Sequence, residues 1–233
     1  MTPTSPFDGF DWIDLSHALE EGIPAWPTHA RFSSTVYESQ DLGDVATHNG
    51  LTLSEHSGTH MDAPLHFVPE GPAHYGTDEI PPERLAGRAA TIEATDLGAG
   101  DLLGPDRIRA WEREHGPIER GDRVLVRYGW DERWATGPEG RLFLDDWPGL
   151  SGEAAEYLVG KGVALVGCDT LAVDAAGSAE NPAHHALLGN EVYIVENLNN
   201  LDRLPPFCLF LALPLKIKGG SGSPVRAVAL VPR

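Results

Sequence analysis

The residues with the clearest capacity for chemistry lie in the segment 54–67, which reads S-E-H-S-G-T-H-M-D-A-P-L-H-F. His56, His60 and Asp62 are spaced there as H-x3-H-x-D. Two imidazoles and one carboxylate suit a borderline divalent ion such as Zn²⁺. Three protein ligands leave a coordination position open for water, which is typical of a catalytic metal site. The spacing therefore predicts a catalytic metal at His56, His60 and Asp62.

The backbone that positions these ligands is expected to be extended rather than helical. The segment contains three residues that disfavour a helix, namely Gly58, Thr59 and Pro64. In an extended segment His60 and Asp62 point to one side, because strand side chains alternate. A bend at residues 57–58 could then swing His56 towards the same centre.

His66 follows Asp62 by four residues, just beyond Pro64, and lies outside the tight ligand set. A general acid or base is needed at such a position, close to a metal-activated water. His66 is therefore predicted to transfer protons. The competing interpretation of the whole segment is a chance cluster of histidines on a polar loop.

Composition indicates a soluble globular protein and excludes several classes of partner. The chain has 233 residues, of which 41% are hydrophobic and 22% charged. A formal net charge of −18 argues against nucleic acid and anionic membrane as partners. We expect a disordered N-terminus at residues 1–10 and a single domain at residues 11–233, since no linker or repeat divides the chain.

The two cysteines, Cys168 and Cys208, lie in apolar runs and are predicted to be reduced core residues. The first residues lack the basic and apolar regions of a signal peptide. No window approaches the 18 apolar residues of a membrane span. A cytoplasmic location is the default expectation.

The order of predicted elements is of the α/β type. Strands are expected at residues 12–16, 31–38, 50–55, 88–94, 124–128, 163–166, 192–196, 207–215 and 225–231. Helices are expected at 105–115, after Ser151 and after Pro182. Residues 41–49 are predicted to be a polar loop, with His48 as a surface histidine.

Two long irregular segments, 67–83 and 129–147, are predicted to shape the substrate pocket. The second contains three tryptophans, which could line an aromatic pocket or pack in the core. Trp26, between two prolines, could lie at a pocket mouth or cover the edge of the core. His74 is a minor candidate ligand.

The ligand segment resembles the HxGTHxDxPxHF signature of the metal-dependent "cyclase" hydrolases, the family of bacterial kynurenine formamidase and isatin hydrolase. Every fixed position of the signature is filled. The glycine-rich segment P-L-K-I-K-G-G-S-G-S-P-V-R-A also resembles the C-terminal block of this family. The resemblance runs from about residue 12 to 231. It implies a swivelling β/β/α fold, with a mixed sheet and surrounding helices, in a homodimer or larger homo-oligomer such as a tetramer.

The resemblance also implies roles for His184 and Glu196, which match the family's A-H-x-x-L-L…E-N-L pattern. From the residues alone, Glu196 ends an apolar strand, where a carboxylate is costly unless it is paired or binds a metal. The family pattern places both residues in the active site and leaves out His185. They are expected either to hold a second metal ion or to complete a proton network around one. The implied cofactor is one or two divalent ions per chain, Zn²⁺ first and Mn²⁺ as the alternative.

The resulting hypothesis is a metal-dependent hydrolase in which an activated water opens a cyclic amide or cleaves an N-formyl arylamide. The substrate is expected to be a small aromatic molecule. A lactone or ester hydrolase of the same family is the alternative. A non-hydrolytic His-His-Asp metal enzyme and an inactive scaffold are the remaining hypotheses. The chain has no G-x-S-x-G motif and no nucleotide-binding glycine motif.

Overall fold

The computed structural model describes residues 6–233, and its centre is a mixed sheet that closes on itself. The strand order is β1-β12-β11-β5-β7-β9-β10-β4, and β12 also pairs with β4. All strands of this sheet except β1 therefore form a ring. The bounds are β1 (Phe10–Asp14), β4 (His60–Asp62), β5 (Ala86–Glu93), β7 (Arg123–Arg127), β9 (Leu165–Cys168), β10 (Tyr193–Glu196), β11 (Phe207–Pro214) and β12 (Gly222–Pro232).

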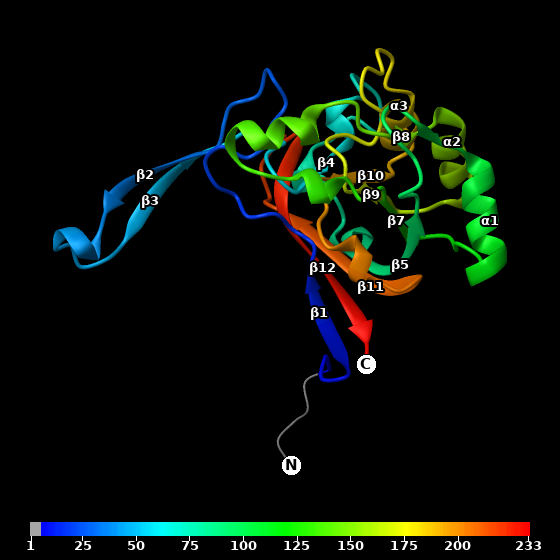
Figure 1. Ribbon diagram of the computed structural model, residues 1–233, viewed down its shortest axis with the longest axis horizontal. Coiled ribbons are helices and arrows are strands. Elements are labelled where there is room, and N and C mark those ends of the chain that lie inside the picture. The colour runs from blue at the N-terminus through cyan, green and yellow to red at the C-terminus, as the bar shows by residue number, and fades with distance from the viewer. Residues whose placement is uncertain (1–5) are drawn as a thin grey trace.

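One half of the ring is parallel and carries the helices. Strands β5, β7, β9 and β10 are parallel neighbours. Their connections contain α1 (Pro105–His115), α2 (Gly152–Lys161) and α3 (Pro182–Leu188), which gather on one side of the sheet (Figure 1). The mixed sheet with surrounding helices predicted from the sequence is therefore confirmed.

Side chains that alternate along the parallel strands feed two separate cores. Val124 and Val126 pack in the core that includes the helices, whereas Leu125 between them packs in the second core, with residues of β4, β11 and β12. Burial on both faces explains why these strands read as continuous apolar runs in the sequence. Met61 of β4 belongs to the second core, so its neighbours His60 and Asp62 face the other way.

The helices begin and end where their local sequence predicts. Pro105 occupies the first turn of α1, whose buried residues are Ile108 and Trp111. The Ser151 hydroxyl accepts the Ala154 N–H and caps α2. Gly162, with φ +74°, ends α2 in the left-handed conformation that glycine adopts freely.

A two-stranded hairpin, which we call the arm, projects from the body of the molecule (Figure 1). It consists of β2 (Ser33–Glu38), β3 (His48–Thr52) and the connection between them, and the two strands pair with each other. The prediction of a loop at residues 41–49 was wrong at its end, because His48 and Asn49 already belong to β3. His48 is exposed, as expected. A second small pair joins β6 (Leu102–Leu103) to β8 (Gly149–Leu150).

Short 3-10 helices occupy much of what the sequence indicated as irregular. In the segment 67–83 they lie at Thr77–Glu79 and from Pro82, the latter ending at Leu85. In the segment 129–147 they lie at Trp130–Arg133 and Gly137–Leu144. The others are Gln40–Leu42, Pro64–His66 and Leu201–Arg203.

At the N-terminus, the predicted disorder of residues 1–10 falls partly outside the described residues, which begin at residue 6. Residues 6–9 form a turn, and Phe10 already pairs with Pro232. Cys168 and Cys208 are buried free thiols, as predicted. Among residues 6–233, no helix combines the length and apolar character needed to cross a membrane.

Candidate metal centre

Strand β4 presents two of the predicted ligands on one face. His60 and Asp62 are both buried and stand on the side of β4 opposite Met61. The short strand is held on both edges, because it pairs with β10 and with β12. The extended conformation expected from the sequence therefore gives these two side chains a common direction and a rigid support.

His56 reaches the same centre through a turn at Gly58. Gly58 has φ +61°, and a Cβ there would lie 2.6 Å from Leu19, so both its conformation and its surroundings favour glycine. The turn brings Nδ1 of His56 to 2.7 Å from Oδ1 of Asp62. The bend predicted at residues 57–58 is thus present.

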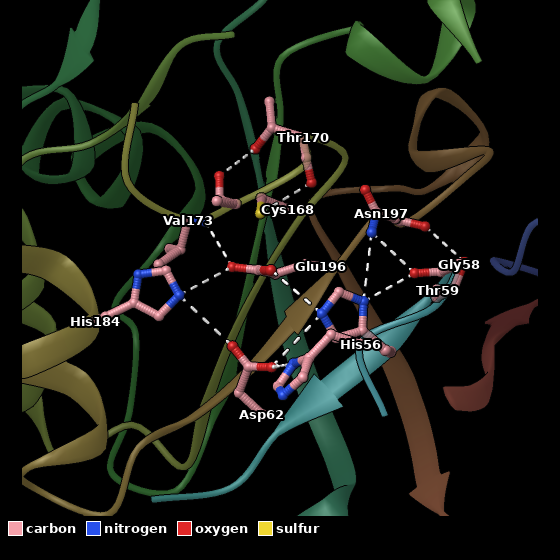
Figure 2. Close-up of polar contacts among 12 residues, drawn as sticks. His56, Gly58, Thr59, Asp62, Cys168, Thr170, Val173, His184, Glu196 and Asn197 are labelled. Atoms are coloured by element: carbon pink, nitrogen blue, oxygen red, sulfur yellow. Dashed lines mark hydrogen bonds and ion pairs between the residues drawn. The ribbon is translucent and has the colours of Figure 1, made fainter. Parts of the chain in front are cut away.

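His184 and Glu196 are supplied by the parallel, helix-bearing half of the sheet, His184 by α3 and Glu196 by β10. His184 lies in the first turns of α3, where Asp174 accepts the N–H groups of Ala183 and His184. Glu196 ends β10, and its Oε1 accepts the N–H of Val173. Both side chains are buried, and His184 faces the carboxylates of Asp62 and Glu196 together (Figure 2).

The two carboxylates each offer one oxygen to each of two imidazoles. Nε2 of His60 lies 3.5 Å from Oδ1 of Asp62 and 3.4 Å from Oε2 of Glu196. Nε2 of His184 lies 3.6 Å from Oδ2 of Asp62 and 3.3 Å from Oε1 of Glu196. Two ligands at about 2.1 Å from a tetrahedral ion are roughly 3.4 Å apart. The arrangement therefore fits two donor sets that share both carboxylates.

Asp62 is the group that most clearly requires a cation. It is fully buried, and neither of its oxygens has a partner with hydrogen-bond geometry among residues 6–233. Burial acts to raise its pKa, but the neighbouring His56 and His184 hold the pKa well below its usual range. A buried carboxylate without hydrogen bonds is costly unless a positive charge neutralises it. The donor set of imidazoles and carboxylates suits a divalent ion.

Hydrogen bonds on the far side of two imidazoles turn Nε2 towards the centre. Nδ1 of His60 lies 2.8 Å from the carbonyl oxygen of Gly58. Nδ1 of His184 lies 2.6 Å from Oδ2 of Asp174. Because both partners accept, we assign the ring proton to Nδ1 in each case, which leaves the Nε2 lone pair for a metal.

His66 stands beside this set, at the end of the 3-10 helix Pro64–His66. Its ring stacks on His56 with centroids 4.1 Å apart. Burial lowers the pKa of His66 to about 4, although Asp62 acts in the opposite direction. His66, His56 and Asp62 are also close enough together to share an ion. The geometry is compatible with the predicted proton-transfer role and also with a ligand role.

A cavity of about 230 Å³ opens onto the centre. Apart from His56, His60, His66, His184 and Glu196, it is lined by Trp26, His29, Phe67, Leu171, Ala172 and Asn181. Trp26 is 43% exposed and packs edge-on against Trp147. A larger hollow of about 690 Å³ lies beside the start of α2, but the described residues that line it include no histidine, so it lacks the donor set.

The pocket wall differs from the sequence expectation. Trp130 and Trp147 are buried, and Trp134 stacks on His17. None of these three tryptophans of the segment 129–147 lines the cavity, whereas Trp26 does. The first of the two predicted segments contributes only Phe67.

Two residues near the metal centre were not predicted from the sequence, and two other histidines lie outside the ligand set. His29 lines the cavity, and its buried Nδ1 has no hydrogen-bond partner among the described residues. Asp174 orients His184 from ten residues upstream, without a recognisable motif. His74 bonds the carbonyl of Val68 away from the centre. His185, left out of the prediction, packs on Phe67.

Comparison with known proteins finds a matching family and similar sequences and structures. Residues 13–175 match the family described as "Putative cyclase". An isatin hydrolase of Roseibium aggregatum is 39% identical over 212 residues, covering 85% of this chain and 80% of the relative. A kynurenine formamidase of Bacillus cereus is 34% identical over 221 residues, covering 94% and 96%. Isatin hydrolase A from Labrenzia aggregata, solved bound to benzyl benzoate, superimposes with a TM-score of 0.89 at 32% identity over 97% of this chain and 95% of that chain.

Proposed function

The chain belongs to the cyclase family, and from this premise we propose that it opens a cyclic amide fused to an aromatic ring, as an isatin hydrolase does. It is a metal-dependent hydrolase of amide C–N bonds. Cleavage of an N-formyl arylamide, as in a kynurenine formamidase, is the alternative at the same site. The observation that carries the proposal is the buried pair Asp62 and Glu196, whose four oxygens face imidazole nitrogens at the floor of a small cavity.

The residues that would hold the metal are the predicted ones. His56 and His60 form one set with one oxygen of each carboxylate, and His184 forms the other with the second oxygen of Asp62 and of Glu196. The shared carboxylates support two ions per chain, with Zn²⁺ or Mn²⁺ as the candidates for these ligands. When bound, such an ion lowers the pKa of its water from 15.7 to about 7 and polarises the amide carbonyl.

The chain's own groups supply proton transfer and orientation. Nδ1 or Nε2 of His66 is free to accept the proton of the attacking water and to pass it to the leaving amide nitrogen. Asp62 and Glu196 would hold the ion that faces the amide carbonyl at the floor of the site. Trp26 and Phe67 line the cavity and would flank an aromatic ring, which fixes the amide against the floor and excludes solvent.

The cavity favours a neutral bicyclic amide over an amino-acid substrate. Among residues 6–233 its lining includes no lysine and no arginine, so a substrate α-carboxylate would meet no cationic side chain of this part of the chain. Glu196 is the one carboxylate that the described residues contribute to the lining, and it faces His60 and His184. A volume of about 230 Å³ suits one fused ring system better than a ring with an extended charged tail.

The test is a comparison of kcat/KM for isatin, N-formylkynurenine and an aliphatic lactone, measured with metal-loaded protein. We expect isatin to be the best of the three. A preference for N-formylkynurenine would select the alternative, and activity on the lactone alone would exclude the amide assignment. Oxygen uptake, or turnover with Fe²⁺ only, would replace hydrolysis by a different chemistry.

We propose further that the chain forms a homo-oligomer through the arm. The arm exposes Val36, Tyr37, Leu42, Val45 and Leu51, and an isolated two-stranded hairpin is only marginally stable in water. It carries three carboxylates, Glu38, Asp41 and Asp44, and no lysine or arginine.

A second copy of the chain offers a surface of matching character at the end of β11. Leu213, Leu215, Lys216 and Lys218 are exposed there, and neither lysine makes an ion pair within residues 6–233. Apolar contact combined with opposite charge therefore supports docking of the arm onto this surface.

The two free buried thiols fit a reducing compartment, and we propose a cytoplasmic location.

A further inference from the structure

The glycine-rich turn that leads into β12 is packed directly against the metal centre. A Cβ at Gly222 would lie 2.5 Å from Cε1 of His56, and one at Gly220 would lie 3.1 Å from Oε1 of Glu55. Ser221, between these glycines, is the residue whose side chain reaches the same two groups. The turn carries no nucleotide-binding motif. Its glycines are explained instead by its close approach to His56, which leaves no room for a Cβ at Gly222.

Ser221 and Glu55 form a hydrogen-bonded chain that ends on His56. The Oγ of Ser221 donates to Oε2 of Glu55 at 2.7 Å, and the N–H of Ser221 donates to the same oxygen at 3.0 Å. Nε2 of His56 lies 3.0 Å from Oγ of Ser221. A hydroxyl has one hydrogen, and here it is directed at the carboxylate. Only the lone pairs of Oγ remain for His56, so the imidazole proton belongs on Nε2.

This assignment determines which nitrogen of His56 faces the metal. Nδ1 lies 2.7 Å from Oδ1 of Asp62, and with the Nε2 proton held by Ser221 it is Nδ1 that is left to bind a metal in place of a proton. The carbonyl of Gly58 and the carboxylate of Asp174 serve His60 and His184 in the same way. Each of the three imidazoles thus has one acceptor behind it, supplied by a different part of the chain.

We propose that Ser221 and Glu55 are positioning residues that hold His56 in the Nε2–H tautomer and thereby raise the affinity of the centre for its metal. The inference rests on the proposed function in that His56 is a metal ligand. Partners behind metal-ligating histidines are commonly worth about 10- to 100-fold in metal affinity. The substitution Ser221→Ala is therefore expected to weaken metal binding within that range.

The experiment measures the dissociation constant for Zn²⁺ and Mn²⁺ by chelator competition, without substrate. Ser223→Ala is the matched control, because this neighbouring hydroxyl bonds the N–H of Leu215 and the carbonyl of Pro224 instead of His56. The control is expected to bind metal as the parent protein does. Substrate plays no part in this measurement, so a wrong choice of amide substrate cannot produce or hide the effect.

Glu55 provides a second variant should Ser221→Ala fold poorly. In Glu55→Ala the Ser221 hydroxyl is free to turn its hydrogen towards His56, which favours the Nδ1–H tautomer and opposes metal binding. Glu55→Gln keeps an acceptor oxygen and is expected to retain most of the affinity. Nitrogen-15 NMR of the metal-free protein should show a proton held on Nε2 of His56 in the parent chain and that proton partly displaced from Nε2 in Ser221→Ala and Glu55→Ala.

Two results bear directly on the idea. Weakened binding together with a shifted His56 tautomer in both alanine variants supports it, since a merely structural role would not move the tautomer. If both variants bind metal as tightly as Ser223→Ala and the tautomer is unchanged, the inference is overturned while the proposed function stands. Absence of metal binding in the parent protein would overturn both.

Discussion

His60 on β4 and Glu196 on β10 are direct partners across the antiparallel ladder, and their side chains meet, with Nε2 of His60 3.4 Å from Oε2 of Glu196. The distance between these two candidate ligands is therefore set by one rung of the sheet. Ile194 is paired with Asp62 in the same ladder. A slip of one residue in this register would turn the ligands away from one another. The sheet closure that brings β4 between β10 and β12 is thus part of the site itself.

The role of His66 can be separated from that of a ligand by His66→Ala. We expect kcat to fall by about 10²- to 10⁴-fold, because a proton-transfer group is lost. Metal per chain, measured by ICP-MS, should stay as in the parent protein. Loss of an ion would instead assign His66 to the set with His56 and Asp62, and an unchanged kcat would remove it from the mechanism.

Trp26 is expected to contribute to substrate binding rather than to the chemical step. Stacking of aromatic rings is worth about 0.5–1.5 kcal/mol beyond burial, so Trp26→Ala should raise KM for isatin by roughly 3- to 10-fold with little change in kcat. Trp12→Ala is the control, since Trp12 is an exposed tryptophan of β1 that packs against Phe7. Equal KM values for the two variants would exclude Trp26 from the binding site.

His17 makes stability dependent on pH away from the metal centre. Its ring stacks on Trp134 with centroids 4.0 Å apart, and burial lowers its pKa to about 4, partly opposed by a hydrogen bond to the Leu198 backbone. The folded state therefore prefers neutral His17. This contribution is complete above the unfolded pKa of about 6.5 and is lost as the pH falls towards 4.

Urea unfolding at pH 7 and pH 5 tests this effect. Between these pH values the parent protein should lose about 2 kcal/mol of its free energy of unfolding through His17. His17→Gln should lack that part of the loss, whereas the exposed His48→Gln should behave like the parent chain. An identical pH dependence in all three proteins would contradict the assignment.

The arm is expected to determine the assembly state. Replacing Leu42 and Val45, which are 81% and 96% exposed, by aspartate places charge in the proposed contact without disturbing a core. We expect light scattering to give a dimer or larger oligomer for the parent chain and a monomer for this double variant. Leu142→Asp, an exposed position on the body, should leave the mass unchanged. A monomeric parent chain would refute the proposal.

Local patterns accounted for much of the fold and for the first ligand set. The extended segment at His60 and Asp62, the turn at Gly58 and the helix from Pro105 all follow from residue preferences over a few positions. Long-range pairings did not follow from such patterns. Closure of the sheet by β12 and β4 joins segments about 160 residues apart, and no local preference of either strand encodes it. His184 and Glu196 could be placed in the active site only through the family resemblance.

The residues that hydrogen-bond to the candidate ligands could not be predicted from local sequence patterns either. Asp174 and Ser221 carry ordinary side chains in ordinary turns, and only the folded chain reveals that they contact His184 and His56. Trp26 lines the cavity because its loop folds over the centre, whereas the three tryptophans at 129–147 are used for packing. Residue type alone could not separate these uses.

The most direct test of the central claim is removal and restoration of the metal. Protein stripped with a chelator should lose its ability to open isatin, and titration with Zn²⁺ or Mn²⁺ should restore turnover in proportion to the ions bound, up to two per chain, with no recovery in His60→Ala. Full activity in the stripped protein, or failure of the parent chain to bind any divalent ion, would contradict the account.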